Sequence, residues 1–550
     1  MTDVRPEDND PSQARATPCV SSTLDRLIQW PAATALPIYL VMVLLTWGTT
    51  PDDGFITLRI AHNLLHHGEP VFNLGDKVEG YSSPLHLLVA ALVTILPADY
   101  TGLILKVIGV AFGAAVLWPT ARLAANVGLG PRGRLASTVG VALSWNLAAS
   151  ASNLLESSMN VLLIVLLLAA LTSFSYRHAA GWAGLLVLVR PESVLMVAAI
   201  AIGWTLLNRA EPVARRTRWI IAPTVVAVVL LAYRLIYFGE LMPNTYYAKE
   251  VPIADAINWG NEYIVHAQPW WGTISVLGLL ALYLQLGLGV TALVSWWRHS
   301  PILLVLPLVV AVQAAFIFRS GGDWMWGARH YAAVTPIVTV MAVYGAKIVA
   351  QAIASSTTGS PVAGRTAVGT AIVGVLLICI AGPGQETVNP AWNTRGVDNG
   401  SLVADGGYGP YSASWIESVR LTSCLPEGAT VSFSEVGYFG YINRELTVID
   451  VRGLTNSAIA KNAAPGIRIR TGVHDPNWQE QGSVVGAELL RRRPDVIVTI
   501  DTDNPPANLY SGTYDFVSTR EVFGKGETDG ALHLNVYRLH TAPDYLCLHG

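Results

Sequence analysis

The chain has 550 residues, of which 52% are hydrophobic and only 13% carry a charge. Soluble domains contain about 25% charged residues, so this composition excludes an ordinary soluble enzyme and indicates a polytopic α-helical membrane protein. The 35 basic and 38 acidic residues give a formal net charge of −3. That balance argues against a nucleic-acid partner and leaves the lipid bilayer as the first expected partner.

Apolar runs long enough to cross a membrane begin after a polar segment, 1–31, which is predicted to be a disordered cytoplasmic tail. The expected spans, within a transmembrane domain over 32–383, are 32–49, 101–121, 134–151, 153–174, 219–238, 273–295, 301–318, 331–350 and 366–383. Two shorter apolar pieces, 180–189 and 192–207, bring the total to about 11 spans. The piece 85–96 is expected to be a half-helix that does not cross.

Basic clusters between these runs set the predicted orientation, because cytoplasmic loops are enriched in lysine and arginine. With the N-terminus in the cytoplasm, every cluster lies on the cytoplasmic side. The clusters contain Arg122, Arg132, Arg134, Arg177, Arg209, Arg215, Arg216, Arg218, Arg298, Lys347 and Arg365. We therefore expect a multi-pass plasma-membrane protein with an extracytoplasmic C-terminus.

Residues 384–550 are much more polar and are predicted to form an extracytoplasmic mixed α/β domain. Strands are expected at Val431–Phe433, Glu445–Val451, Val496–Ile500 and Leu532–Leu539, with a helix near Gly486–Arg492. Cys424 and Cys547 both fall in this domain, where an oxidising compartment permits a disulfide. Sequence leaves their pairing open.

The first outer loop, 50–100, begins with two adjacent acids, Asp52 and Asp53, directly after the first apolar run. The following residues have helical periodicity, which predicts an interfacial helix with its apolar side toward lipid and its polar side toward the acids. Either acid could cap that helix. Two adjacent acids at a membrane surface also suit a general base acting on a hydroxyl, or a metal site.

Further polar residues are expected on the same outer face as candidate ligands for a donor phosphate or a substrate. Charges at the edge of a membrane segment are costly and usually functional, and arginine suits a phosphate. Aromatic and amide side chains suit a carbohydrate, although aromatic residues also form interfacial belts. The candidates are Arg59, Arg190, Glu192, Asn244, Tyr246, Lys249, Asp323, Trp324, Arg329 and His330. An internal Arg190–Glu192 pair that braces two helices is the alternative at that break.

No cofactor is clearly required by these motifs, although a divalent cation bound by Asp52, Asp53 and Asp323 would suit a leaving phosphate. His62 and His66 have the spacing of zinc ligands on a helix. They lack an HExxH motif, a cysteine partner and a third ligand, so a polar helix face is the better interpretation of that pair.

The segment PDDGFITLRIAHNLLHHGEPVFNLGDKVEGYSSPL resembles the first outer loop of GT-C glycosyltransferases that use polyprenyl-phosphate sugars. It is most similar to that of the actinobacterial terminal arabinofuranosyltransferases of cell-wall arabinogalactan. Similar motifs follow in the same order: NLLESSMNVLL, LVRPESVL, LMPNTYYAK, GGDWMWGARHYAAVTP and VGYFGYINRELTVIDVRGLTN. The resemblance spans roughly residues 50 to 456.

The resemblance implies a polyprenyl-phosphate donor, a cell-envelope glycan acceptor and inverting transfer of arabinofuranose on the outer face. The catalytic base of such enzymes maps onto Asp52 and Asp53. Transfer of mannose or another hexose to protein or lipid is the alternative within this class. A transporter or flippase is a different class, but the hydropathy pattern shows no internal repeat. A non-catalytic glycan receptor is a third.

Overall fold

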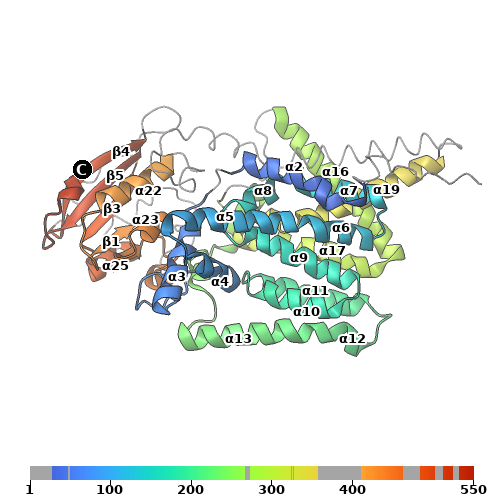
Figure 1. Ribbon diagram of the computed structural model, residues 1–550, viewed down its shortest axis with the longest axis horizontal. Helices are drawn as coiled ribbons and strands as arrows, with labels where there is room; N and C mark the ends of the chain where they lie inside the picture. Colours follow the sequence, from blue (N-terminus) through green and yellow to red (C-terminus); the bar gives the residue numbers. More distant parts are fainter. Residues whose placement is uncertain are drawn as a thin grey trace, which may run out of the picture.

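A bundle of apolar helices and a five-stranded sheet lie side by side along the long axis of the computed structural model (Figure 1). The structure describes residues 28–47, 50–266, 273–323, 325, 328–356, 410–462, 483–501, 512–523 and 532–549. The predicted span 366–383 and nearly all of the predicted tail 1–31 lie outside these residues.

The bundle is built from helices that mostly follow the predicted apolar runs. Its helices are α2 (Pro31–Leu45), α3 (Asp53–His67), α4 (Pro84–Val93), α5 (Ala98–Ala115), α6 (Leu117–Asn126), α7 (Pro131–Ala142), α8 (Trp145–Ala151), α9 (Ser157–Thr172), α10 (Tyr176–Val187), α11 (Ser193–Leu207), α12 (Val213–Thr217), α13 (Ile221–Tyr237), α14 (Asn244–Ala248), α15 (Ile253–His266), α16 (Thr273–His299), α17 (Val305–Ser320), α18 (Arg329–Ala332) and α19 (Thr335–Ser356).

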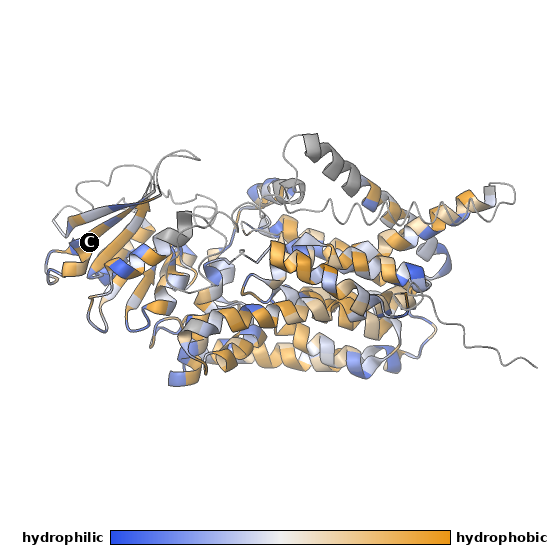
Figure 2. Cartoon of the chain, turned by 45° about the horizontal axis from the view of Figure 1, so that its top comes forward, coloured by the Kyte–Doolittle hydropathy of each residue, from blue (hydrophilic) through white to orange (hydrophobic). Residues whose placement is uncertain are grey.

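Four helical segments among the described residues are long and apolar enough to cross a membrane: Tyr100–Asn126, Val213–Tyr237, Pro301–Ser320 and Thr335–Ser355. Shorter apolar helices accompany them, including α2, α9 and α11. Figure 2 shows hydrophobic residues along most of the bundle and hydrophilic residues gathered toward helix ends. The total of about 11 spans stays a prediction. The predicted half-helix is α4, which has 10 residues and is too short to span.

Several predicted spans are interrupted where the bundle turns. The run 134–151 is divided into α7 and α8 because Ser144, whose side chain accepts a hydrogen bond from Leu147 N, starts a new helix. The run 153–174 becomes helical only at Ser157.

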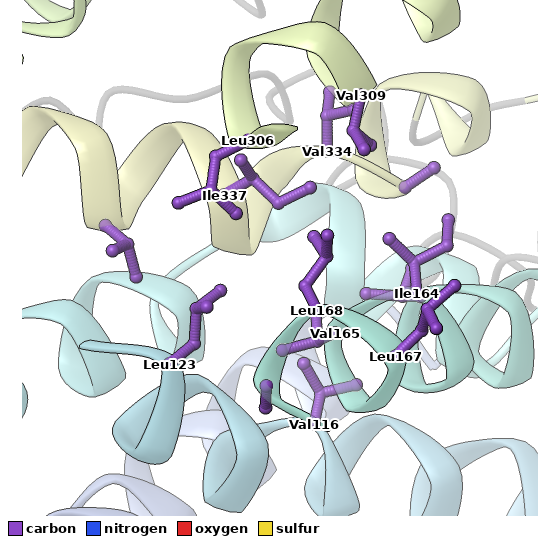
Figure 3. Close-up of a cluster of buried hydrophobic side chains, with 14 of the residues drawn as sticks. Val116, Leu123, Ile164, Val165, Leu167, Leu168, Leu306, Val309, Val334 and Ile337 are labelled. Atoms are coloured by element: carbon purple, nitrogen blue, oxygen red, sulfur yellow. The ribbon is translucent and has the colours of Figure 1, made fainter. Parts of the chain in front are cut away.

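The core between the helices is made of interlocking aliphatic side chains, among them Ile164, Val309 and Ile337 (Figure 3).

The C-terminal domain contains a mixed sheet of order β2-β1-β3-β5-β4, in which β1, β2 and β3 are parallel and β5 is antiparallel to β3 and β4. Four of its strands and α25 agree with the predicted positions, whereas β4 was not predicted. The elements are α22 (Pro410–Leu421), β1 (Thr430–Phe433), α23 (Val436–Ile442), β2 (Thr447–Asp450), α24 (Ser457–Asn462), α25 (Val484–Arg492), β3 (Val496–Asp501), β4 (Tyr514–Phe523) and β5 (Leu532–Leu539).

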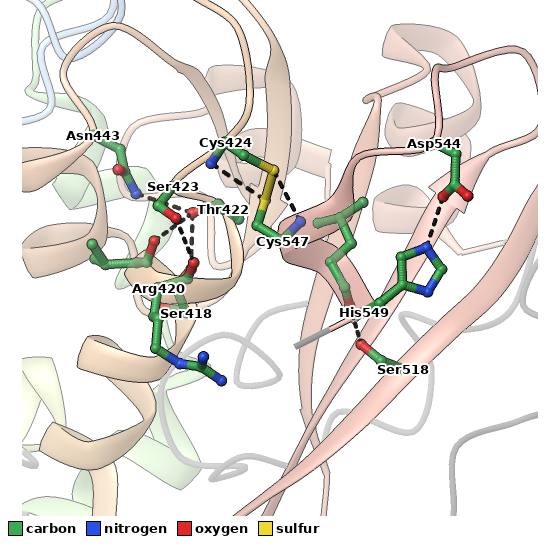
Figure 4. The surroundings of a disulfide bond; sticks show 12 residues. Ser418, Arg420, Thr422, Ser423, Cys424, Asn443, Ser518, Asp544, Cys547 and His549 are labelled. Atoms are coloured by element: carbon green, nitrogen blue, oxygen red, sulfur yellow. Dashed lines mark hydrogen bonds and ion pairs between the residues drawn. A yellow bond between two sulfur atoms is a disulfide. The ribbon is translucent and has the colours of Figure 1, made fainter.

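A disulfide joins Cys424 to Cys547, which resolves the pairing that sequence left open (Figure 4). The two cysteines are 123 residues apart, and each sulfur accepts a hydrogen bond from the backbone N–H of the other cysteine. The bond therefore ties the segment after β5 to the segment after α22. A link of this kind stabilises a domain mainly by restricting its unfolded chain.

Helix α3 forms the junction between the two parts, and its orientation differs from the predicted one. Ile56 and Ile60 belong to one buried cluster with Phe433 and Phe439 of the sheet domain. The apolar side of α3 therefore faces the C-terminal domain, because that domain offers a complementary apolar surface. The prediction that this side faces lipid is wrong, although the helix itself is confirmed.

The first outer loop also covers the exposed edge of the sheet. Asn73 accepts a hydrogen bond from Val448 N at 3.0 Å and donates one to Val448 O at 2.8 Å. Its side-chain amide thus pairs with edge strand β2 as a neighbouring strand would. Unpaired edges invite unwanted association, so this contact both protects the edge and fixes the position of the loop.

Candidate active site

Asp52 is buried at the junction, with 4% of its surface exposed. Its carboxylate accepts hydrogen bonds from Gly437 N at 2.6 Å and Tyr438 N at 2.8 Å, at the start of α23. Burial, and then the neighbouring Glu435, raise the pKa of the Asp52 carboxyl well above its usual range, although the two N–H donors oppose this. Asp52 makes no side-chain hydrogen bond to its own helix α3. It therefore joins the two domains and does not cap α3.

Gly437 approaches Asp52 so closely that a side chain would not fit. A Cβ on Gly437 would lie 1.9 Å from the backbone oxygen of Asp52 and 2.8 Å from its carboxyl carbon. Gly437→Ala must therefore displace α23 from the first outer loop. We expect it to reduce the activity of the site at least ~10-fold, because small misplacements of reacting groups are costly.

The matched control for this prediction is Gly181→Ala in α10, where nothing lies within 4 Å of an added Cβ and alanine favours the helix. Initial rates of both purified variants would be compared with those of the natural chain. Equal activity of Gly437→Ala and Gly181→Ala would contradict the close approach of α23 to Asp52.

Asp53 is the first residue of α3 and has a different environment from its neighbour. Its side chain is 18% exposed, and its Oδ2 lies 3.7 Å from Nζ of Lys249, whose side chain is 35% exposed. Arg329 also interacts electrostatically with Asp53. Of the two adjacent acids, Asp53 is thus the more exposed, and it has a cation beside it.

Arg190 connects three segments of the helical bundle. Its Nη1 donates to Glu156 at 3.0 Å, its Nε donates to Glu192, and its Nη2 lies 3.3 Å from Nδ1 of His330. The predicted Arg190–Glu192 pair therefore exists, but it is one part of a larger network. Glu156 precedes α9 and was not predicted as a site residue.

Asp323, Arg329 and His330 form the second half of the network. Asp323 is paired with Nε of Arg329 and lies 3.7 Å from Nε2 of His330. Burial alone would raise the pKa of Asp323, but Arg329, His330 and Lys249 together hold it below its usual range. Burial, and then Arg190, lower the pKa of His330 well below its usual value.

Strained backbone flanks this network on both sides. Leu154, two residues before Glu156, has φ 60°, and Ala328, directly before Arg329, has φ 45°. Residues other than glycine seldom adopt positive φ, and such strain clusters at functional sites. His86 Nε2 lies 3.0 Å from the carbonyl oxygen of Leu154 and helps to hold that segment.

Two predicted ligands instead hold the domains together. Arg59 is buried and donates to Gly440 O, Leu446 O and Phe72 O, each at 2.7 Å. The side-chain amide of Asn244 donates to Gly453 O at 2.7 Å and to Leu454 O at 2.9 Å. These roles differ from the predicted phosphate or substrate contacts.

Tyr246 and Trp324 are two further predicted ligands. Tyr246 is 44% exposed and its ring centroid lies 5.5 Å from that of Tyr247. Its proposed contact with a sugar stays a prediction. Trp324 lies outside the described residues.

The residues suggested for a metal do not form a suitable donor set. Both carboxylate oxygens of Asp52 accept backbone N–H groups, and Asp323 is paired with Arg329. Among the described residues, no three His, Cys, Asp or Glu side chains are grouped so that they could hold a metal ion. The two rings of His62 and His66 lie 4.2 Å apart on the surface of α3.

The overall architecture matches that of solved membrane glycosyltransferases. The apo structure of ArnT from Cupriavidus metallidurans has a TM-score of 0.52 and 13% identity, covering 94% of this chain and 98% of that one. Its structure bound to undecaprenyl phosphate has the same score and identity, with coverage of 93% and 98%. At this identity the likeness shows the fold alone. The chain has the predicted GT-C-like fold of a polytopic membrane protein, followed by an α/β domain.

Two curated relatives carry the name terminal beta-(1->2)-arabinofuranosyltransferase. The chain is 26% identical to the one from Mycobacterium tuberculosis over 353 residues, which are 55% of this chain and 53% of that protein. It is 28% identical to the one from Corynebacterium glutamicum over 331 residues, 50% and 45% of the two chains. The chain thus spans about half the length of the curated relatives it matches. These matches confirm the resemblance noted from the motifs.

A family model matches the C-terminal domain over residues 409–539. Its description is a domain of unknown function, DUF8728. The match covers the whole sheet, so it supports the sheet domain as a recurring unit and leaves its role open.

Proposed function

We propose that the chain is a membrane glycosyltransferase that moves arabinofuranose from a polyprenyl-phosphate donor to a cell-envelope glycan on the outer face of the plasma membrane. The different environments of the two adjacent acids carry this proposal. Asp52 is occupied by backbone N–H groups, whereas Asp53 is accessible beside Lys249. The names of the curated relatives and the ArnT structure with undecaprenyl phosphate support the sugar and the donor class.

In this mechanism Asp53 acts as general base. It takes the proton of an acceptor hydroxyl while that oxygen bonds to the anomeric carbon of the donor. The bond between the anomeric carbon and the phosphate oxygen breaks at the same time, and the electron pair leaves with the lipid phosphate. A single displacement of this kind inverts the anomeric configuration.

Lys249, Arg190 and Arg329 are the proposed partners of the donor phosphate. Positive groups fixed near the leaving oxygens stabilise the charge that develops there. The carboxylates of Glu156 and Asp323 hold the two guanidinium groups in place before substrate arrives. Arginine that is fixed in this way loses little freedom on binding phosphate.

The test uses the purified full chain in lipid nanodiscs, with decaprenyl-phosphoryl arabinose and an arabinan oligosaccharide as substrates. We expect transfer with inversion, at a rate at least ~10-fold above that with polyprenyl-phosphate mannose. If only the mannose donor gave product, the transferred sugar would be a hexose and the proposed reaction class would be unchanged. Absence of product from every polyprenyl-phosphate sugar would contradict the proposed function.

A further inference from the structure

Two charged residues of the C-terminal domain lie at the edge of the sheet that faces the candidate site. Glu435 follows β1 by two residues and Arg452 follows β2 by two residues. The strands are parallel, and their last residues, Phe433 and Asp450, are register partners, so both charges lie at one carboxyl edge. In open α/β sheets, ligands bind outside the carboxyl ends of the strands.

Arg452 and Glu435 form an ion pair whose hydrogen-bonding capacity is only partly used. Nη2 of Arg452 lies 2.7 Å from Oε1 of Glu435, and the two side chains are 28% and 11% exposed. Nε of Arg452 is buried and has no hydrogen-bond partner among the described residues. This donor is therefore free to bind an acceptor atom of a ligand.

This pair is held next to the proposed base from two directions. Gly437, two residues after Glu435, donates to Asp52, the neighbour of Asp53. Asn244 donates to the carbonyl of Gly453, the residue after Arg452. Asn244 starts α14 and Lys249 ends it, so the same short helix contacts the proposed base and the backbone next to Arg452.

The charged residues around the site differ between the side formed by the helical bundle and the side formed by the C-terminal sheet domain. On the bundle side, three cations (Arg190, Lys249, Arg329) face three carboxylates (Glu156, Glu192, Asp323). On the sheet side, the carboxyl groups of Asp52, Asp53, Glu435 and Asp450 all interact electrostatically with Arg452, and Glu435 is its direct ion-pair partner. An anionic phosphate is therefore disfavoured on the sheet side, whereas a neutral ligand rich in hydroxyl groups is not.

We propose that Arg452 and Glu435 bind the acceptor glycan and present its hydroxyl to Asp53. Arg452 donates to sugar oxygens and Glu435 accepts from sugar hydroxyls, which is the complementary pattern that a polyol requires. The C-terminal domain thereby completes the active site. The inference rests on the proposed function and assigns its acceptor subsite.

The test measures acceptor and donor dependence separately in Arg452→Gln. We expect the KM for an arabinan oligosaccharide to rise at least ~10-fold, because charge-assisted hydrogen bonds to the acceptor are lost. The KM for decaprenyl-phosphoryl arabinose should stay within about twofold. Arg420→Gln is the matched control, since Arg420 forms an exposed pair with Glu417 in the same domain. A merely structural role for Arg452 would change both KM values together or neither.

A binding measurement without donor separates this inference from the proposed function. Isothermal titration of the natural chain with the arabinan oligosaccharide should show binding, and Arg452→Gln should weaken it at least ~10-fold. That result would support the acceptor subsite even if no transfer occurred. Absence of binding to the natural chain, or an unchanged affinity in Arg452→Gln, would overturn the subsite. If Arg452→Gln bound the oligosaccharide as tightly as the natural chain and transfer were normal, the subsite would be wrong and the proposed function would stand.

Discussion

Asp53→Asn is expected to abolish transfer while the chain stays folded. Loss of a general base typically costs about 10²–10⁴-fold in rate. Asparagine has nearly the same shape as aspartate, and within the described part of the chain the direct ion pair that it removes is the partly exposed contact with Lys249 at 3.7 Å. Such a pair contributes little to stability, so we expect the unfolding temperature to change by no more than a few degrees. The measurement is kcat with saturating donor and acceptor, beside thermal unfolding in the same nanodiscs.

Asp52→Asn is the matched control, because the two acids are adjacent and the substitution is identical. Here the carboxylate accepts two backbone N–H groups, and an amide can accept only with its oxygen. We expect Asp52→Asn to lower the free energy of unfolding by about 1–3 kcal/mol and to keep measurable transfer. A folded Asp53→Asn variant with normal kcat, beside an inactive and equally stable Asp52→Asn variant, would reassign the base to Asp52.

The raised pKa of Asp52 alone would favour Asp52 as the base, because perturbed carboxyl groups often mark catalytic sites. Geometry argues otherwise. A base must reach the proton that it removes, and Asp52 is 4% exposed with both oxygens engaged. Burial in an interdomain contact is a sufficient cause of its shift. We therefore assign the reaction to the more accessible acid.

Local sequence patterns predicted much of the fold, because helices and strands of an apolar chain follow short-range periodicity. Helix α3 is an example, since Ile56 and Ile60 recur at helical spacing. The surface that α3 faces was predicted wrongly. Its partner helix α23 lies some 380 residues further along the chain, and no local pattern states that the two will meet.

The edge strand β4 shows another limit of local patterns. Its pairing with β5 contains register irregularities between Phe516 and Ser518 and between Glu521 and Phe523. These break the alternation by which a strand is normally found. The residues of β4 therefore form a strand because they pair with β5, and not because their own sequence alternates.

The candidate site was predicted in part for the same reason. The bundle residues Arg190, Asp323, Arg329 and His330 follow recognisable breaks in apolar runs and lie in one network, while their role in binding stays a prediction. Glu156 was missed, although a single acid between apolar stretches is costly unless paired and could have signalled a site. Arg452 could not be predicted as a site residue, since its position near Asp53 depends on how the whole C-terminal domain is oriented.

Arg59→Ala is expected to give the largest loss of stability among the substitutions considered. The guanidinium donates to three backbone carbonyls at 2.7 Å, of Phe72 in the first outer loop and of Gly440 and Leu446 in the C-terminal domain. Each buried carbonyl that loses its donor costs about 1–3 kcal/mol. Two of the three carbonyls belong to the C-terminal domain, so the free energy of docking between the two domains should fall by at least ~2 kcal/mol. Burial, and then Arg444, lower the pKa of Arg59 to about 9, so the arginine remains charged at pH 7.

Limited proteolysis measures this docking directly, because a released C-terminal domain exposes the loop and α23 to cleavage. Arg59→Ala should be cut much faster than the natural chain at pH 7. Arg420→Ala serves as control, since its pair with Glu417 is exposed and worth at most about 1 kcal/mol. Equal cleavage rates in the two variants would contradict the role of Arg59 at the junction.

Arg59→Lys should resemble Arg59→Ala, because one ammonium cannot reach three carbonyls that the planar guanidinium contacts at once. The proposed active site contains groups from both domains, so loss of docking at Arg59 should also remove transfer without any change to Asp53 itself.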